Sequence, residues 1–245
     1  MNYVITTPPQ AAIPVASTAN QAENKSFFPV HRIYCVGRNY AAHAKEMGGN
    51  PDREPPFFFC KPADAVVPVS ANKSLALPYP TQTSDYHHEI ELVVAIGKAG
   101  KDIAVKAAFD YIWGYAVGLD MTRRDLQTAL REQGRPWDLA KAFDQSAPIG
   151  AIYPANRIGH PQAGHIWLKI NGKLRQSGRL EHMIWSVSET ISHLSRYFEL
   201  QPGDLIFTGT PAGVGPIVAG DQLNGGIDGL GEISLHCTST QVSNY

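Results

Sequence analysis

The sequence predicts an α+β fold dominated by a mixed β-sheet or roll. Short apolar runs bounded by Gly, Pro or Asn outnumber helical patterns along the 245 residues, and the two kinds of segment do not alternate strictly, as a doubly wound parallel sheet would require. The chain holds 22 Gly and 18 Pro, while charged residues make up only 18%. This composition excludes a coiled coil, a long helical bundle and a disordered polyelectrolyte.

The first 27 residues are rich in Ala, Thr, Pro and Asn, and we expect them to form an arm (1–27) that docks on a single domain at 28–245. We do not expect the arm to be a secretory signal, because no Lys or Arg lies near its start and three prolines interrupt it. The three cysteines are widely spaced, with no C-x-x-C pair. We therefore expect a cytoplasmic protein without disulfides or a membrane span. The net charge of −1 provides no basic surface for nucleic acid.

The expected elements follow in order along the domain. A first short strand covers Ile33–Val36, and a short helix over Ala41–Met47 stops at a Gly-Gly pair. Apolar spacing predicts further helices over 123–131 and 186–198. The remaining apolar runs predict strands at 57–60, 65–69, 89–96, 111–119, 166–170, 205–207 and 232–237.

Two acidic residues interrupt one of these strands. Glu89 and Glu91 alternate with apolar residues, so both project from the same face, about 6–7 Å apart. One interpretation is an edge strand with a solvated acidic face. The other is a buried site with a counter-charge. The counter-charge is needed because burying an unpaired carboxylate costs on the order of several kcal/mol.

A third carboxylate, Asp120, directly follows the apolar run 111–119. Thr122 and Asp125 resemble a capping box, so Thr122 is expected to cap the next helix and Asp120 is left without a structural role. Three carboxylates offer only oxygen ligands. They therefore predict a site for a hard cation, Mg2+ or Mn2+ with Ca2+ as a substitute, rather than for zinc.

Two polar pairs have helical spacing. Arg124 and Gln127 share one helix face, which indicates either an ordinary surface helix or groups aimed at an anionic or carbonyl substrate. His43 and Glu46 also lie three residues apart, the arrangement in which a carboxylate orients an imidazole as a general base, although such pairs are commonly surface contacts. Residues 48–51 next to them would be the hinge of a lid.

Two further segments allow alternatives. Lys141 lies in a weakly charged segment, where a solvated lysine is the default expectation. The Gly-rich segment 208–215 lacks the Lys-Ser/Thr of a nucleotide-binding loop, so it is either a tight turn or a loop whose amides and hydroxyls hold a carboxylate or carbonyl.

Taken together, these segments resemble the fumarylacetoacetate hydrolase family. The resemblance covers roughly residues 30–237, and its blocks occur in the family's order. The stretch from Arg124 to Lys141 is most similar to the bacterial branch that cleaves fumarylpyruvate in gentisate degradation. The matching blocks are 37–43 with Glu46, 61–62, 89–91, 120–127, Lys141, 171–172 and 202–211.

The resemblance implies a catalytic domain of β-rich mixed fold, usually in a homodimer. It implies Mg2+ or Mn2+ held by Glu89, Glu91 and Asp120, with His43 and Glu46 as the dyad that activates water. The expected reaction is hydrolysis of a carbon–carbon bond in a small anionic 1,3-dicarbonyl compound, fumarylpyruvate, to fumarate and pyruvate.

Five further residues have expected roles in that reaction. Lys141 and Gln127 are expected to stabilise the oxyanion. Arg38, Arg124 and the loop with Thr210 are expected to hold the substrate carboxylates. Alternatives within the family are an acylpyruvase, an oxaloacetate decarboxylase and a diene-dioate isomerase. An alternative outside catalysis is a metal-stabilised binding module.

Overall fold

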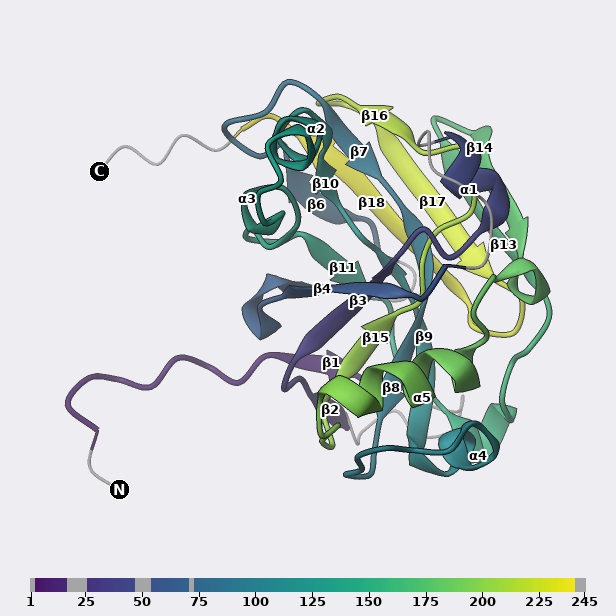
Figure 1. Ribbon diagram of the computed structural model, residues 1–245. Helices are drawn as coiled ribbons and strands as arrows, with labels where there is room; N and C mark the ends of the chain where they lie inside the picture. Colours follow the sequence, from purple (N-terminus) through teal and green to yellow (C-terminus); the bar gives the residue numbers. More distant parts are fainter. Residues whose placement is uncertain (1–2, 17–25, 47–53, 71–72, 241–245) are drawn as a thin grey trace.

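The computed structural model describes residues 3–16, 26–46, 54–70 and 73–240 (Figure 1). Within these ranges the strands form one eight-stranded and one five-stranded sheet, with two smaller sheets beside them. Parallel and antiparallel pairs occur together in both large sheets. The helices are few and short apart from one of 11 residues. The predicted α+β fold, dominated by mixed sheet, is confirmed.

The eight-stranded sheet carries the acidic strand near its centre. Its path is β4-β3-β15-β8-β9-β11-β5, and β12 pairs with β9 beside that path. Its strands are β3 (Ile33–Gly37), β4 (Phe57–Lys61), β5 (Val66–Pro68), β8 (Ile90–Ile96), β9 (Ile112–Leu119), β11 (Ala147–Ile149), β12 (Tyr153–Pro154) and β15 (Leu205–Phe207).

Strand β8 is buried on both faces. Ile90, Leu92 and Val94 belong to one apolar cluster, whereas Val93 and Ala95 belong to another on the opposite face. A strand covered on both faces has a nearly continuous apolar sequence, as β8 does. The interpretation of an edge strand with a solvated acidic face is therefore wrong.

The five-stranded sheet covers the first of these clusters, in the order β14-β13-β17-β18-β6. The sequence analysis did not predict β6, in which only Leu77 is buried, and it also missed β14 and β17. Only one residue of β14, Gln176, is buried, and β17 contains two glycines, so neither shows a strong apolar alternation. The strands are β6 (Leu75–Pro78), β13 (His165–Ile170), β14 (Lys173–Arg179), β17 (Gln222–Ile227) and β18 (Glu232–Thr238).

A three-stranded sheet lies beside the acidic cluster. It consists of β7 (Tyr86–His88), β10 (Thr122–Arg123) and β16 (Gly215–Ile217), with β7 in the middle. These short strands bring three distant parts of the chain together at the point where β8 begins and β9 ends.

The three predicted helices are present within the described residues. They are α1 (Ala41–Glu46), α2 (Arg124–Glu132) and α5 (Val187–Tyr197), and the short α3 (Asp138–Lys141) and α4 (Ala155–Ile158) were not predicted. A capping box of Ser186 and Glu189 begins α5. No helix in the described ranges is long and apolar enough to span a membrane.

The expected cap of α2 is wrong. Helix α2 follows Arg123 and has no side-chain cap. The Asp125 carboxylate instead accepts hydrogen bonds from the Thr83 hydroxyl at 2.6 Å and the Ser84 N–H at 3.0 Å. The antiparallel pairing of β10 with β7 sets the start of this helix. The Thr122 side chain is buried and does not cap it.

The arm at 1–27 has two parts in the described residues. Strand β1 (Ala12–Pro14) pairs with β2 (Phe27–Pro29), and Ile13 is fully buried. The Pro14 carbonyl also accepts a hydrogen bond from the Ile152 N–H at 2.9 Å, so this part is docked on the domain. Residues 3–9 are exposed and extend away from it (Figure 1).

A buried carboxylate ties together the starts of two parallel strands. The Asp204 side chain is fully buried just before β15. It accepts hydrogen bonds from the Arg32 guanidinium at 2.8 and 3.0 Å and lies 2.8 Å from His31 Nδ1. Because Arg32 immediately precedes β3, this contact fixes β3 against β15.

We expect Asp204→Ala to lower the free energy of unfolding by about 2–3 kcal/mol, since a hydrogen bond to a charged group contributes roughly 1.5–3 kcal/mol. Urea unfolding followed by circular dichroism measures the change. The control is Asp110→Ala at an exposed position, expected to stay within about 0.5 kcal/mol. Superimposed transitions for Asp204→Ala and the parent would contradict the prediction.

Candidate active site

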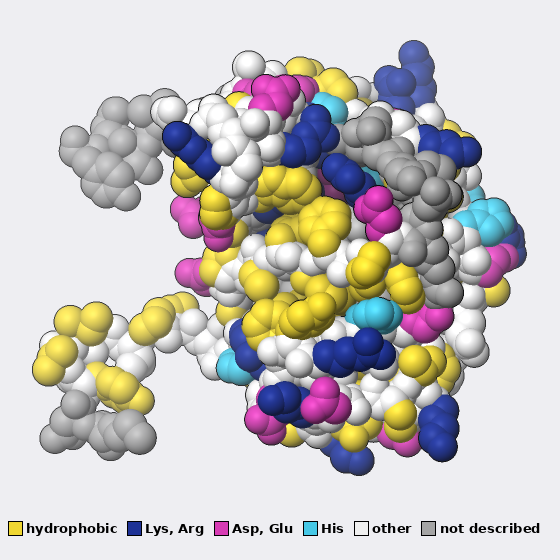
Figure 2. Space-filling model, viewed as in Figure 1, with side chains coloured by type: hydrophobic (Ala, Val, Ile, Leu, Met, Phe, Trp, Pro, Cys, Tyr) yellow, Lys and Arg dark blue, Asp and Glu magenta, His cyan; other side chains and the backbone are white. Residues whose placement is uncertain are grey.

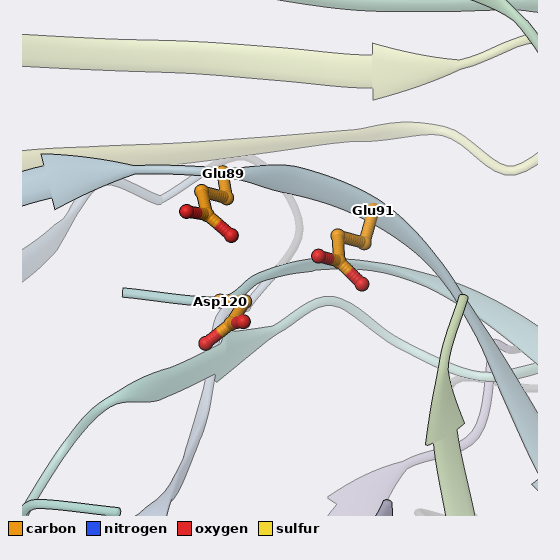
Figure 3. Close-up of side chains that lie close together, drawn as sticks. All are labelled: Glu89, Glu91 and Asp120. Carbon is orange, nitrogen blue, oxygen red and sulfur yellow. The ribbon is translucent and has the colours of Figure 1, made fainter. Parts of the chain in front are cut away.

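Three buried carboxylates meet where β8 begins and β9 ends. Glu91 lies in β8 opposite Gly118 of β9, and Glu89 immediately precedes β8. Asp120 follows β9, and its N–H donates a hydrogen bond to the Glu89 carbonyl at 2.9 Å. One oxygen from each side chain lies within 4.8 Å of the others, and Figure 3 shows the three side chains gathered together. The structure thus brings together the acidic residues that the sequence singled out.

Three cations surround two of these carboxylates. Glu89 pairs with the Arg124 guanidinium and lies 3.0 Å from Lys141 Nζ. Asp120 lies 2.7 Å from Lys141 Nζ and 2.9 Å from Lys61 Nζ. Burial acts to raise the pKa of Glu89, but Lys141 and Arg124 outweigh it and hold that pKa well below its usual value.

Glu91 is the carboxylate that lacks such a cation. In the described part of the chain its carboxylate accepts a hydrogen bond from the Gly209 N–H, at 2.7 Å, and pairs with no Lys or Arg. Burial, Asp120 and Glu89 together raise its pKa well above the usual value. Asp120 Oδ1 also has no hydrogen-bond donor, because the nearby Lys61 ammonium does not meet it in hydrogen-bond geometry. These oxygens fit a divalent cation of the kind that binds all-oxygen ligand sets.

Lys141 is buried, so the expectation of a solvated lysine is wrong. Its Nζ donates to Glu89 Oε2 at 3.0 Å, to Asp120 Oδ2 at 2.7 Å and to the Thr122 hydroxyl at 2.6 Å. An ammonium has three N–H donors, so all of them are used within the site. The Thr122 hydroxyl therefore supports Lys141 rather than a helix end.

Lys61 is a site residue that the sequence analysis matched to the family but gave no role. Its side chain is completely buried, and its Nζ donates to the carbonyls of Lys141 and Met121. The sequence did contain a signal for Lys61: it is a charged residue at the end of the aromatic strand β4. Asp120 is likewise a charged residue directly after the apolar strand β9. Two residues of the site, Lys61 and Asp120, could therefore have been found as charges at the ends of apolar strands.

Arg124 and Gln127 lie on the buried face of α2, each 7% exposed. Arg124 Nη1 donates to Gln127 Oε1, so the Gln127 amide nitrogen keeps its N–H donors for another partner. Arg124 Nε donates to His87 Nδ1 at 3.3 Å. Burial and then Arg124 lower the pKa of His87, which favours the neutral imidazole.

His43 and Glu46 form the expected pair. His43 Nδ1 lies 3.3 Å from Glu46 Oε2, and His43 is only 5% exposed, which excludes an ordinary surface contact. Both Glu46 oxygens also accept from the Gly213 N–H, at 3.1 and 3.2 Å, so α1 is joined to the loop 208–215. Gly213 has φ +94°, and a Cβ there would lie 2.0 Å from the Arg175 carbonyl oxygen. The expected hinge at 48–51 lies outside the described residues.

Arg38 and Thr210 both line the pocket that contains the carboxylate cluster. Arg38 follows β3 with φ 55°, and its guanidinium carbon lies 5.9 Å from the centre of the Phe57 ring. The Thr210 hydroxyl donates to the Ile90 carbonyl at 2.8 Å and accepts from Gln176 Nε2 at 2.7 Å. Thr210 therefore holds the loop against β8 and does not direct its proton into the cavity.

One pocket is lined by all of the predicted site residues except Glu46, which contacts His43. Its other wall is apolar and aromatic, and Figure 2 shows hydrophobic side chains gathered across this face with Lys and Arg beside them. Apolar walls exclude water and strengthen the electrostatic interactions inside. The lining is Val36, Gly37, Arg38, His43, Phe57, Phe59, Glu89, Glu91, Asp120, Arg124, Gln127, Arg131, Trp137, Lys141 and Thr210.

The chain is similar to a solved structure over almost its whole length. That structure is the fumarylpyruvate hydrolase from Pseudomonas aeruginosa in complex with Mn2+ and pyruvate, which is 56% identical, with a TM-score of 0.93. The match covers 97% of this chain and 100% of that chain. The resemblance to the branch that acts on fumarylpyruvate is thereby confirmed.

The chain is also similar to proteins that are named oxaloacetate tautomerases rather than fumarylpyruvate hydrolases. The mitochondrial oxaloacetate tautomerase of Mus musculus is 46% identical over 198 residues, which cover 81% of this chain and 87% of that protein. Its counterpart from Arabidopsis thaliana is 42% identical over 204 residues, covering 83% and 89%. Residues 32–237 match the family described as the C-terminal domain of fumarylacetoacetate (FAA) hydrolase. Because this match spans most of the chain and contains the whole carboxylate cluster, the protein belongs to the fumarylacetoacetate hydrolase family.

Proposed function

We propose that this enzyme is a hydrolase dependent on Mg2+ or Mn2+ that cleaves a carbon–carbon bond of fumarylpyruvate to give fumarate and pyruvate. The observation that carries the proposal is the His43–Glu46 pair, which opens on the same pocket as three buried carboxylates. A base and a metal cluster in one pocket suit metal-assisted attack by water. The 56% identity to the fumarylpyruvate hydrolase of Pseudomonas aeruginosa supports this substrate.

The charges around the pocket favour a dianionic substrate. Glu89, Glu91 and Asp120 are balanced in number by Lys61, Lys141 and Arg124. A divalent cation would add two positive charges, which the two carboxylates of fumarylpyruvate would balance. Arg38 and Arg131 also line the pocket, so the entering substrate meets further positive charge.

Glu89, Glu91 and Asp120 would hold the metal ion, which when bound acts as a Lewis acid toward the pyruvyl end of the substrate. Glu46 faces His43 Nδ1 and holds the proton on that nitrogen, so Nε2 is the base that removes a proton from water. Water oxygen adds to the carbonyl carbon of the fumaryl group. The carbon–carbon bond then breaks, fumarate leaves, and the pyruvate enolate takes up a proton.

The remaining residues orient the substrate and stabilise charge. The free N–H groups of Gln127 would donate to the oxyanion, and Lys141 would add its positive charge nearby. Arg38 and Arg124 would hold the carboxylates, and Thr210 would support the loop beside them. Each role uses a side chain that already lines the pocket.

The second candidate is an oxaloacetate tautomerase, favoured by the 46% identity to the mouse relative. Tautomerisation moves one proton between carbon and oxygen and consumes no water. Oxaloacetate is also shorter than fumarylpyruvate. Product analysis separates the two activities, since only the hydrolase releases two carboxylic acids from one substrate.

We also propose that the enzyme is a cytoplasmic homodimer of gentisate degradation. Cys35, Cys60 and Cys237 are free thiols, which supports a reducing compartment. Phe57 and Leu139 are exposed by 37% and 65%, as apolar residues at an interface between subunits would be in a single chain. Light scattering on the purified full-length chain gives the oligomeric state.

The substrate is tested by incubating the purified enzyme and Mn2+ in parallel with fumarylpyruvate, acetylpyruvate and oxaloacetate. We expect fumarylpyruvate to be consumed fastest. Chromatography of the products should show fumarate and pyruvate in equal amounts. Enolisation of oxaloacetate is followed by ultraviolet absorbance in the same preparation. Rapid loss of the oxaloacetate enol without cleavage of either acylpyruvate would support the tautomerase and overturn the hydrolase.

The base is tested by His43→Ala. We expect kcat to fall by about 10^2–10^4-fold, the usual contribution of a positioned base, while Mn2+ affinity stays unchanged because His43 is not a ligand. The matched control is His182→Ala, at an exposed position outside the pocket. Turnover by His43→Ala at the parent rate would remove His43 from the mechanism.

Metal binding is tested by Glu91→Gln. Because Glu91 is buried beside two like charges with no cation of its own, the neutral amide should leave the melting temperature in chelator equal or higher. Mn2+ affinity by calorimetry should fall by about tenfold or more, at least the loss seen for residues that merely support ligands. Glu132→Gln, on the exposed end of α2, is the control. Unchanged Mn2+ affinity would exclude Glu91 as a ligand.

A further inference from the structure

We propose that Asp85 and His87 are positioning residues that fix the Arg124 guanidinium for a carboxylate of the substrate. This inference rests on the proposed function, in which Arg124 binds substrate. Neither Asp85 nor His87 lines the pocket, and the sequence analysis gave neither a role. They form a chain of side chains that runs from the surface to the site.

Hydrogen-bond chemistry allows only one assignment of donors and acceptors among Arg124, His87 and Asp85. Arg124 Nε lies 3.3 Å from His87 Nδ1. A guanidinium only donates, so His87 Nδ1 is the acceptor and carries no proton. The other ring nitrogen, Nε2, lies 2.8 Å from Asp85 Oδ1 and donates its N–H there. Asp85 thus selects the tautomer of His87 that can accept from Arg124.

The backbone holds the same segments together. The Arg124 N–H donates to the Asp85 carbonyl at 2.8 Å. His87 of β7 pairs with Thr122 of β10, two residues before Arg124. The start of α2 is therefore fixed to residues 85–87 at two points, and the imidazole meets the guanidinium in a defined register.

The consequence for Arg124 is a fully oriented donor group. A guanidinium has five N–H bonds. His87 takes the one on Nε, Gln127 takes one on Nη1, and Glu89 takes one on Nη2. One N–H is left on each terminal nitrogen, the number that a two-point contact with a carboxylate requires. Without His87, the guanidinium could rotate about its last bonds and lose that alignment.

The decisive feature is the acceptor atom at the Nδ1 position, and three variants of His87 isolate it. In His87→Asn the amide oxygen takes the place of Nδ1. In His87→Gln the amide reaches toward Asp85 but no acceptor occupies the Nδ1 position, and His87→Leu removes both contacts. His87 lies outside the described core clusters, which favours folding of all three variants.

The experiment measures anion affinity rather than turnover. Pyruvate and fumarate are each titrated by calorimetry into the full-length chain saturated with Mn2+. Arg124→Gln first identifies which of the two anions depends on Arg124. We expect the affinity for that anion to fall about tenfold in His87→Leu and His87→Gln, and to stay within about twofold in His87→Asn. Asp85→Ala, which removes the acceptor of the His87 Nε2 proton, should resemble His87→Leu.

Each other outcome overturns the proposal. Equal losses in all three His87 variants would indicate a general structural effect. No loss in any of them, or no dependence of either anion on Arg124, would exclude a positioning role. A loss that follows a parallel fall in Mn2+ affinity would place the effect on Glu89, the carboxylate that Arg124 also contacts. The expected pattern in a protein that does not cleave fumarylpyruvate would uphold the positioning and refute only the hydrolase.

Discussion

Glu89, Glu91 and Asp120 each place a carboxylate oxygen within 4.8 Å of the other two in the interior of the protein, and the surrounding structure counters the repulsion between these acidic groups. Carboxylates in such a place stay ionised only with cations and hydrogen-bond donors close by. Lys141 contacts two of the three, and Lys61 and Arg124 each contact one. Glu91 is left with a backbone N–H. This asymmetry fits a site for a divalent cation better than it fits a complete ion-pair network.

Two neighbouring strands make this density of charge possible. Strands β8 and β9 are antiparallel, so the start of one lies beside the end of the other, and the acidic residues occupy that junction. Both strands are covered by apolar side chains, which fixes their backbone independently of the charges. The chemistry of the site therefore depends on a rigid frame that the charged groups themselves do not have to stabilise.

The sequence predicted the parts of the site whose signals are local. A carboxylate within or just after an apolar run, and pairs three residues apart on a helix, identified Glu89, Asp120 and His43. Contacts between segments that are distant in the sequence produce no local pattern from which they could be predicted. Thr122 looked like a helix cap because the sequence does not show the pairing of β10 with β7. The strands β14 and β17 were missed for a related reason, since their order comes from neighbouring strands rather than from their own alternation.

The hydrogen bonds between Glu46 and Gly213 join two segments that are 167 residues apart in the sequence. Helix α1, which carries His43, and the loop 208–215 beside the cluster are therefore tied to each other. An insertion or deletion in either segment would displace the other, even though each looks like an independent surface feature. Divergence of substrate range in this enzyme is consequently expected to proceed by paired changes in α1 and 208–215, and efforts to redesign it gain most by rebuilding both together.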